Sequence, residues 1–123
     1  MADFPQFAST LARHKNSDKH VTLAFTLGLK SLEKGDSTAI ILLDGVHVGR
    51  AAYCDDINIS EPFLPVKDML EVYPDNGGEL LVCGSCWKHD HLPDNERLER
   101  ARVISEDRVI DLLMNAKSNI QLN

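Results

Sequence analysis

Two cysteines, Cys83 and Cys86, lie three positions apart in the run Cys-Gly-Ser-Cys, directly after a short apolar segment. A thiolate is both a nucleophile and a metal ligand, so this spacing is typical of catalytic or metal-binding thiols. Residues 80–82 are apolar without helical spacing and follow the turn signal Asn76-Gly77-Gly78, which predicts a β-strand ending near the first cysteine. The pair therefore lies at the carboxyl end of a predicted strand, where α/β proteins commonly place their chemistry.

A helix is expected to begin directly after the first cysteine, at Gly84 or Ser85. The free N–H groups of a helix N-terminus favour negative charge, so they would favour the thiolate over the thiol at Cys83. A strand end beside a helix N-terminus also predicts some exposure to solvent. We therefore expect Cys83 to be the reactive and accessible thiol of the pair.

The residues alone leave three interpretations of this pair open. In the first, Cys83 and Cys86 perform dithiol redox chemistry, although the chain offers no good candidate for the cis-proline loop that opposes a thioredoxin active site. In the second, they bind zinc together with His89 and His91, although four ligands from one short turn close around a tetrahedral metal only with difficulty. In the third, the two thiols are inert small residues of the core.

Two further side chains are candidates for the same site. His47 follows the turn Asp44-Gly45 at the end of a predicted strand. It is expected either at the same sheet edge as Cys83 or as a partly exposed loop histidine. Cys54 lies in a predicted loop and is expected either to approach Cys83 or to be a small buried hydrophobic residue.

The totals describe an ordinary globular chain of 123 residues, 43% apolar and 26% charged, with a formal net charge of −6. The negative charge argues against nonspecific binding to nucleic acid or to an anionic membrane surface. No apolar run approaches the roughly 18 residues needed to span a bilayer. Three cysteines and an N-terminus without a signal-peptide pattern indicate a cytoplasmic protein. The Gly77-Gly78 spacing matches no phosphate or dinucleotide motif, and the leading interpretation of the site expects neither a cofactor nor a metal.

Hydrophobic periodicity predicts alternating strands and helices along the chain. Strands are expected over 7–11, 38–43, 80–82, 103–104 and 119–122, helices over 21–32, 63–73 and 109–116, a helical turn within 46–53 and a short solvated helix within 93–102. Ser17 or Asp18 and then Ser105 are predicted N-caps. This order predicts a single α/β domain over residues 1–123, with a parallel sheet flanked by helices. The helix over 21–32 is apolar on several sides, which favours burial against a second subunit.

Four parts of the sequence resemble the DsrE/DsrF-like family, especially its small, YchN-like branch. They are residues 22–30 with 34–35, 40–46, 63–70 with 76–78, and 81–86, and they cover nearly the whole chain in order. The resemblance implies a compact α/β domain that forms homo- or hetero-oligomers, often trimers or hexamers. It also implies sulfur transfer between proteins by way of a cysteine persulfide. The family's sulfur-carrying cysteine falls on Cys83, and Cys86 matches a second cysteine found in many relatives.

The function implied by this resemblance is sulfur relay between a donor protein and an acceptor protein. Cys83 would take up sulfane sulfur as a persulfide and present its outer sulfur to the acceptor. Cys86 would act as a resolving thiol, which attacks the persulfide, releases sulfide and leaves a disulfide. The alternatives are a thiol-disulfide oxidoreductase that uses both cysteines, or a non-catalytic oligomeric binding module whose cysteines are structural or bind zinc.

The sequence departs from the family pattern just after the cysteines. Relatives tend to read Arg-Gly where this chain has Asp90-His91, which leaves less positive charge beside the thiolate. Lys88, His89 and His91 are the candidates to replace that charge. The alternative for all three is a solvated turn without a role in the chemistry.

Overall fold

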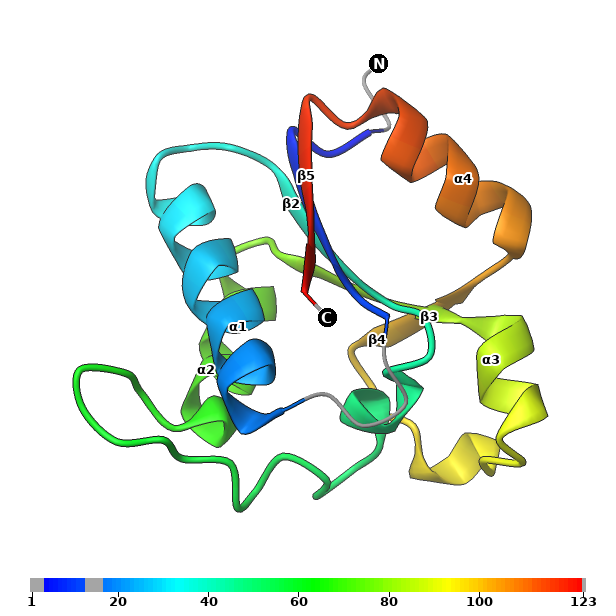
Figure 1. Cartoon of the computed structure of the whole chain (residues 1–123), viewed down its shortest axis with the longest axis horizontal. Helices are drawn as coiled ribbons and strands as arrows, with labels where there is room; N and C mark the ends of the chain where they lie inside the picture. Colours follow the sequence, from blue (N-terminus) through cyan, green and yellow to red (C-terminus); the bar gives the residue numbers. More distant parts are fainter. Residues whose placement is uncertain (1–3, 13–16, 123) are drawn as a thin grey trace.

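The computed structural model describes residues 4–12 and 17–122, which form a five-stranded sheet with helices on both faces (Figure 1). The strands are β1 (Phe7–Leu11), β2 (Thr38–Leu42), β3 (Glu79–Cys83), β4 (Ala101–Ile104) and β5 (Ser118–Leu122). Their order across the sheet is β4-β3-β2-β1-β5, and every neighbouring pair is parallel. The α/β architecture expected from the sequence, a parallel sheet flanked by helices, is confirmed.

The helices form a layer on each side of this sheet. They are α1 (Asp18–Glu33), α2 (Val66–Asp75), α3 (Gly84–His89) and α4 (Glu106–Asn115), with the 3₁₀ turns η1 (Val46–Gly49) and η2 (Asp94–Glu96). Figure 1 shows α1 and α2 on one face, and α4 on the other with α3 beside the sheet edge. The core under α1 and α2 is the larger one, and in it the rings of Phe25 and Tyr73 meet edge to face.

The central strand β2 is buried along its whole length, because it has a strand on each side and a helical layer on each face. Its continuous aliphatic run suits this position. Ile40 packs in the core under α1 and α2, whereas Ile41 packs in the core under α4. Both predicted N-caps are present. Ser17 Oγ accepts from the His20 amide at 3.1 Å, and Ser105 Oγ accepts from the Arg108 amide at 3.2 Å.

The helix predicted over 63–73 has different ends in the structure. It begins only at Val66, because Pro65 is its N-cap and has a ψ of 140° outside the helical range. It also runs through Pro74 to Asp75. Proline removes one backbone hydrogen bond, and this loss is tolerable at Pro74 because the helix ends one residue later.

The solvated helix predicted within 93–102 is wrong. This segment holds only the short turn η2, and from Ala101 onward it forms strand β4 at the edge of the sheet. The alternating charges of this segment suggest an exposed helical face. In the structure, its charged side chains instead form ion pairs with other elements. Arg102, for example, lies 3.2 Å from Glu79 at the start of β3. Pairing with β3 therefore outweighs the local helical preference of the segment.

The first helix is only partly covered within the chain. Its buried residues, which face the sheet and α2, are Val21, Thr22, Ala24, Phe25 and Gly28. Leu23 and Leu27 lie to the side and are half-buried. The second subunit expected against this helix stays a prediction.

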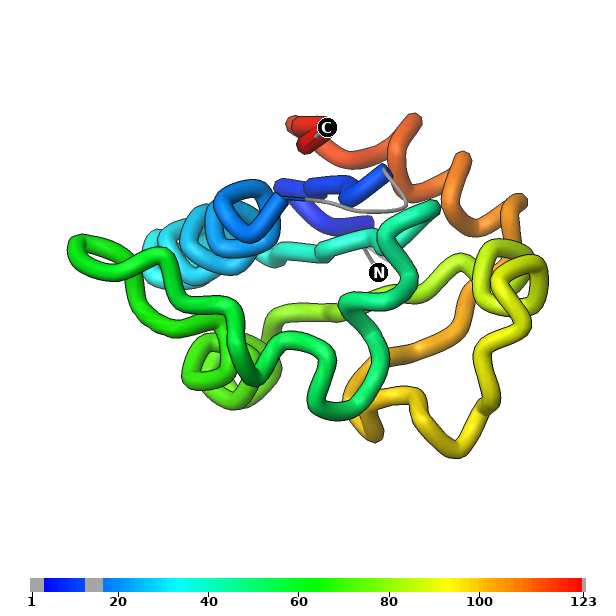
Figure 2. The backbone as a smooth tube through the Cα atoms, turned by 60° about the horizontal axis from the view of Figure 1, so that its bottom comes forward, coloured from blue at the N-terminus to red at the C-terminus, as the bar shows by residue number. Residues whose placement is uncertain are grey.

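The long connection of residues 50–65 runs outside the sheet from η1 to α2, as Figure 2 shows. Cys54 and Ile57 from this connection are buried in the core under α1 and α2. Within the described part of the chain, no helix combines the length and the apolar character needed to cross a bilayer.

Candidate functional site: the thiol pair at the carboxyl end of β3

The strand-to-helix junction predicted at the cysteines is confirmed. β3 ends at Cys83, and α3 begins at Gly84 with Cys83 as its N-cap. Cys83 lies beside Ile104, the last residue of β4, and Val82 before it lies beside Leu42, the last residue of β2. Because the strands are parallel, the segments that follow β2, β3 and β4 all begin at this edge of the sheet.

Cys83 is only 3% exposed, so the accessibility expected from the sequence is wrong. The first turn of α3 closes tightly over the strand ends. A Cβ atom built on Gly84 would lie 3.0 Å from Val103 Cγ1 of β4. The Cys83 side chain also makes no capping hydrogen bond with the described amides of α3. The helix therefore acts on the sulfur through its dipole and not through a direct hydrogen bond.

Cys86 is the partner of Cys83 and is partly exposed. Burial raises the pKa of the Cys86 thiol to about 12, and its hydrogen bond to Cys83 and the charge of Cys83 add to this shift. The carboxylates of Asp44 and Asp90 raise the same pKa further. At neutral pH Cys86 is therefore a thiol, which can donate a hydrogen bond to the neighbouring Cys83.

The helix that carries Cys86 is anchored by the residue next to it. Trp87 is 2% exposed and belongs to the core under α1 and α2. The guanidinium of Arg97 lies over its ring, 5.6 Å from the ring centre. The inward position of Trp87 fixes the rotation of this short helix, and so fixes the side on which Cys86 lies.

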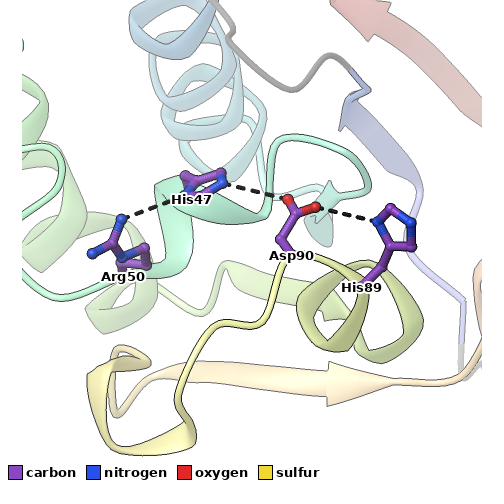
Figure 3. A network of polar contacts seen from close by, with 4 residues as sticks. All are labelled: His47, Arg50, His89 and Asp90. Atoms are coloured by element: carbon purple, nitrogen blue, oxygen red, sulfur yellow. Dashed lines mark hydrogen bonds and ion pairs between the residues drawn. The ribbon is translucent and has the colours of Figure 1, made fainter.

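A polar network joins η1 to the end of α3 (Figure 3). His47 Nε2 lies 3.4 Å from Asp90 Oδ2, and His89 Nδ1 lies 3.5 Å from Asp90 Oδ1. On its other side, His47 Nδ1 lies 3.4 Å from Arg50 Nη1. Arginine can only donate, so Nδ1 accepts and Nε2 carries the proton that faces Asp90. Arg50 in turn bonds Glu96 at 3.1 Å. Of the two positions expected for His47, the structure supports the one at the sheet edge.

Asp90 is the residue of this site that sequence reasoning missed. The sequence singles out this position only because relatives tend to have an arginine there. The available signal was its spacing, because Asp90 follows Cys86 by four residues and so shares its face of a helix. Its pairing with His47 carried no signal, since the two belong to segments that follow different strands.

No protein-family model matches this sequence, and no curated protein matches it. Solved structures with a similar fold do match this chain. The YchN protein from Escherichia coli has a TM-score of 0.69 at 12% identity, over 94% of this chain and 97% of that one. MTH1491 from Methanobacterium thermoautotrophicum, a protein of unknown function, has a TM-score of 0.68 at 15% identity, over 97% and 99%. The chain has the DsrE-like fold. At these identities the likeness shows the fold alone.

The other candidate side chains of the site, Lys88, His89 and His91, are exposed to solvent. Lys88 lines an open cleft between the first turns of α3 and α4. The side chain of His89 is 89% exposed, although it contacts Asp90. His91 is exposed and adopts a φ of +57° in the turn that ends α3. The charged groups that raise the pKa of Cys86 are Cys83, Asp44 and Asp90, and none of these three side chains is among them.

The third cysteine has a structural role. Cys54 is 1% exposed, and its Sγ lies 3.8 Å from the carbonyl oxygen of Val48. Burial is the main cause that raises its pKa to about 12, followed by the charges of Asp55 and Asp18. Cys54 therefore stays a protonated thiol and behaves as a small buried hydrophobic residue, the second of the two roles expected for it.

The four residues of the zinc interpretation do not form a ligand set. Among residues 4–12 and 17–122, no three side chains of His, Cys, Asp or Glu converge as metal ligands. Cys83 is buried on one side of α3, whereas His89 and His91 are exposed at the other end of this helix. The geometry of this site gives zinc binding no support.

Proposed function

We propose that this DsrE-like chain is a sulfur-relay protein that carries sulfane sulfur as a persulfide on Cys83. The observation that carries the proposal is the placement of Cys83 where β3 ends and α3 begins, with the Cys86 thiol on the first turn of that helix. In such a pair Cys83 is the nucleophile, and Cys86 stabilises its negative charge. The resemblance of the sequence to the DsrE/DsrF-like family supports the same assignment.

Loading and delivery are two thiol-exchange steps. The Cys83 thiolate attacks the outer sulfur of a donor persulfide, so that a new S–S bond forms while the donor leaves as a thiolate. In delivery, the thiolate of an acceptor attacks the outer sulfur on Cys83, and Cys83 leaves as a thiolate. Neither step consumes an oxidant, because one sulfane sulfur passes between two thiols.

The burial of Cys83 sets a condition on both steps. A persulfide at a site that is 3% exposed is shielded from small reductants in solution. Transfer to another protein therefore requires the covering turn to open. A cleft of about 550 Å³ begins at Gly84, next to Cys83 in the chain, and is walled by residues 105–107 at the start of α4. This cleft is the approach that we propose for the donor and the acceptor.

A thiol-disulfide oxidoreductase is less well supported by the same pair. Such an enzyme needs Cys86 to ionise and resolve a mixed disulfide on Cys83. Burial and the carboxylates of Asp44 and Asp90 raise the pKa of Cys86 and so oppose this ionisation. Resolution by Cys86 would therefore be slow.

The test is intact mass spectrometry after incubation with sodium tetrasulfide under non-reducing conditions. We expect the mass gain of one sulfur atom in the unmodified chain and in Cys86→Ser, and none in Cys83→Ser. Cys54→Ser is the matched control and should load like the unmodified chain. A gain that persists in Cys83→Ser would contradict the proposal. A loss of two hydrogens that needs both Cys83 and Cys86, without a sulfur adduct, would favour the oxidoreductase.

We also propose that the chain assembles as a homo-oligomer, a trimer or hexamer as the family resemblance implies. The half-buried Leu23 and Leu27 on α1 support an additional contact surface. Sedimentation at micromolar concentration should give a mass above that of one chain. A monomer at that concentration would contradict assembly and leave the persulfide proposal untouched.

A further inference from the structure

A persulfide on Cys83 has a competing reaction within the same chain. As a thiolate, Cys86 would attack Sγ of Cys83, form the Cys83–Cys86 disulfide and expel the outer sulfur as HS⁻. The proton of Cys86 goes to solvent, the sulfane sulfur is reduced to sulfide, and the two cysteines are oxidised, so the step needs no other reactant. A carrier must suppress this discharge, and the discharge requires Cys86 to ionise.

The carboxylate of Asp90 is fixed on the Cys86 side of α3. Asp90 is the C-cap of this helix, and its amide donates to the Cys86 carbonyl oxygen at 3.1 Å. Residues four apart lie on one face of a helix, so this carboxylate and the thiol are neighbours. The contacts of Oδ2 with His47 and of Oδ1 with His89 hold the carboxylate from two sides.

The burial of Asp90 makes its charge effective. Its side chain is 13% exposed, so solvent screens its field less than that of a surface carboxylate. Asp44, the other carboxylate near Cys86, is an exposed residue of the loop after β2. Asp44 raises the pKa of Cys86 more than Asp90 does, but only Asp90 is held by contacts on both carboxylate oxygens and shielded from water.

We propose that Asp90 is a positioning residue whose fixed negative charge holds Cys86 in its thiol form, so that the persulfide on Cys83 is retained and not discharged as sulfide. The inference rests on the proposed function. It assigns Cys86 the role of hydrogen-bond donor in place of the resolving role expected from the sequence. The raised pKa of Cys86, to which Asp90 contributes, agrees with it.

The first experiment measures the pH profile of Cys86 alkylation by iodoacetamide, with Cys83 and Cys86 distinguished by fragment ions. In Asp90→Asn, which keeps the shape and removes the charge, the profile should move to lower pH. At a fixed pH below its midpoint, the Cys86 rate should rise about two- to threefold, because the rate follows the fraction of Cys86 that is ionised. Asp90→Glu, which keeps the charge, should restore most of the original profile. Asp111→Asn, a charge removal at an exposed site of α4, should have no effect.

The second experiment follows sulfide release after loading with sodium tetrasulfide and removal of the excess. Asp90→Asn should lose its persulfide several-fold faster and accumulate the Cys83–Cys86 disulfide. Adding Cys86→Ser to this variant should restore the persulfide lifetime. Asp90→Ser is a second neutral variant in case the asparagine variant does not fold.

The two experiments separate the two proposals. An unchanged Cys86 profile in a folded, charge-neutral variant overturns the inference about Asp90 while persulfide loading stands. A chain whose Cys86 profile shifts as expected but which loads no sulfur overturns the proposed function, and with it the role of Asp90 in retaining a persulfide.

Discussion

His47 Nε2 lies 3.4 Å from Asp90 Oδ2, and this contact joins the turn that follows β2 to the helix that follows β3. The two side chains are 18% and 13% exposed, so the pair is shielded from solvent. His47 is held in turn by Arg50. The pair therefore links the two segments that surround the thiols, and substitution of either partner should lower the stability of the fold.

His47→Ala should lower the free energy of unfolding by about 1–3 kcal/mol, because a mostly buried carboxylate loses the imidazole that lies 3.4 Å from it. Urea denaturation followed by far-UV circular dichroism measures this change. His89→Ala is the matched control. It removes the other histidine that contacts Asp90, but at an exposed site, and should change stability by no more than about 0.5 kcal/mol. Equal effects of the two substitutions would contradict a special role for His47.

His91→Gly should stabilise the protein by about 1 kcal/mol. His91 has a φ of +57°, a left-handed conformation that disfavours residues with a Cβ atom. Its amide donates to the Lys88 carbonyl oxygen and the Leu92 amide donates to that of Trp87, as in a Schellman motif, where glycine is preferred. His89→Gly inside α3 should instead destabilise by about 1 kcal/mol. Thermal unfolding of both variants provides the comparison, and a destabilised His91→Gly would contradict this account of the turn.

Gly78→Ala should destabilise much more than Gly77→Ala. A Cβ atom on Gly78 would overlap the ring of Tyr73, which is fully buried. Gly77 has open space around it, so only its φ of +94° disfavours alanine at this position. We expect about 1 kcal/mol for Gly77→Ala and about 3 kcal/mol for Gly78→Ala, measured by denaturant titration. A Gly78→Ala variant no less stable than Gly77→Ala would show that the Tyr73 ring can move aside.

Stability should fall at alkaline pH through the buried thiol of Cys54. Its pKa in the folded protein is raised from 9.0 to about 12, so the unfolded state loses its proton first. The stabilising contribution is complete below pH 9 and is lost as the pH rises to 12. The slope is at most about 1.4 kcal/mol per pH unit. Cys54→Ala should flatten this decline in urea denaturation at pH 8, 9 and 10. Equal slopes in the two proteins would contradict it.

The order of the elements was accessible from the sequence because the hydrophobic period changes where the structure changes. The clearest case is Cys83, where an apolar run gives way to small and polar residues and β3 gives way to α3. Local pattern failed where tertiary pairing decided the outcome. The charges before Ala101 are typical of an exposed helix. In the structure, however, Ala101 pairs with Leu80 and begins the edge strand β4.

The surroundings of the thiols could not be predicted in the same way. The burial of Cys83 depends on Val103 and Ile104, which follow it by about twenty residues and reach it only because β4 lies beside β3. Likewise, His47 reaches Asp90 only because β2 is the other neighbour of β3. The environment of the thiols thus depends on which strands are neighbours in the sheet, and the hydrophobic pattern of a single sequence does not reveal that order.

Cys83 and Cys86 belong to one uninterrupted strand–helix segment, whereas Asp44 and His47 come from the loop after β2. The separation of the two sulfurs is therefore set by a single covalent turn and does not depend on η1. Mutation in that loop changes the charge around the thiols without changing the distance between them. In evolutionary terms the two thiols are inherited as one unit, and selection can adjust the reactivity of Cys83 from a separate stretch of the gene.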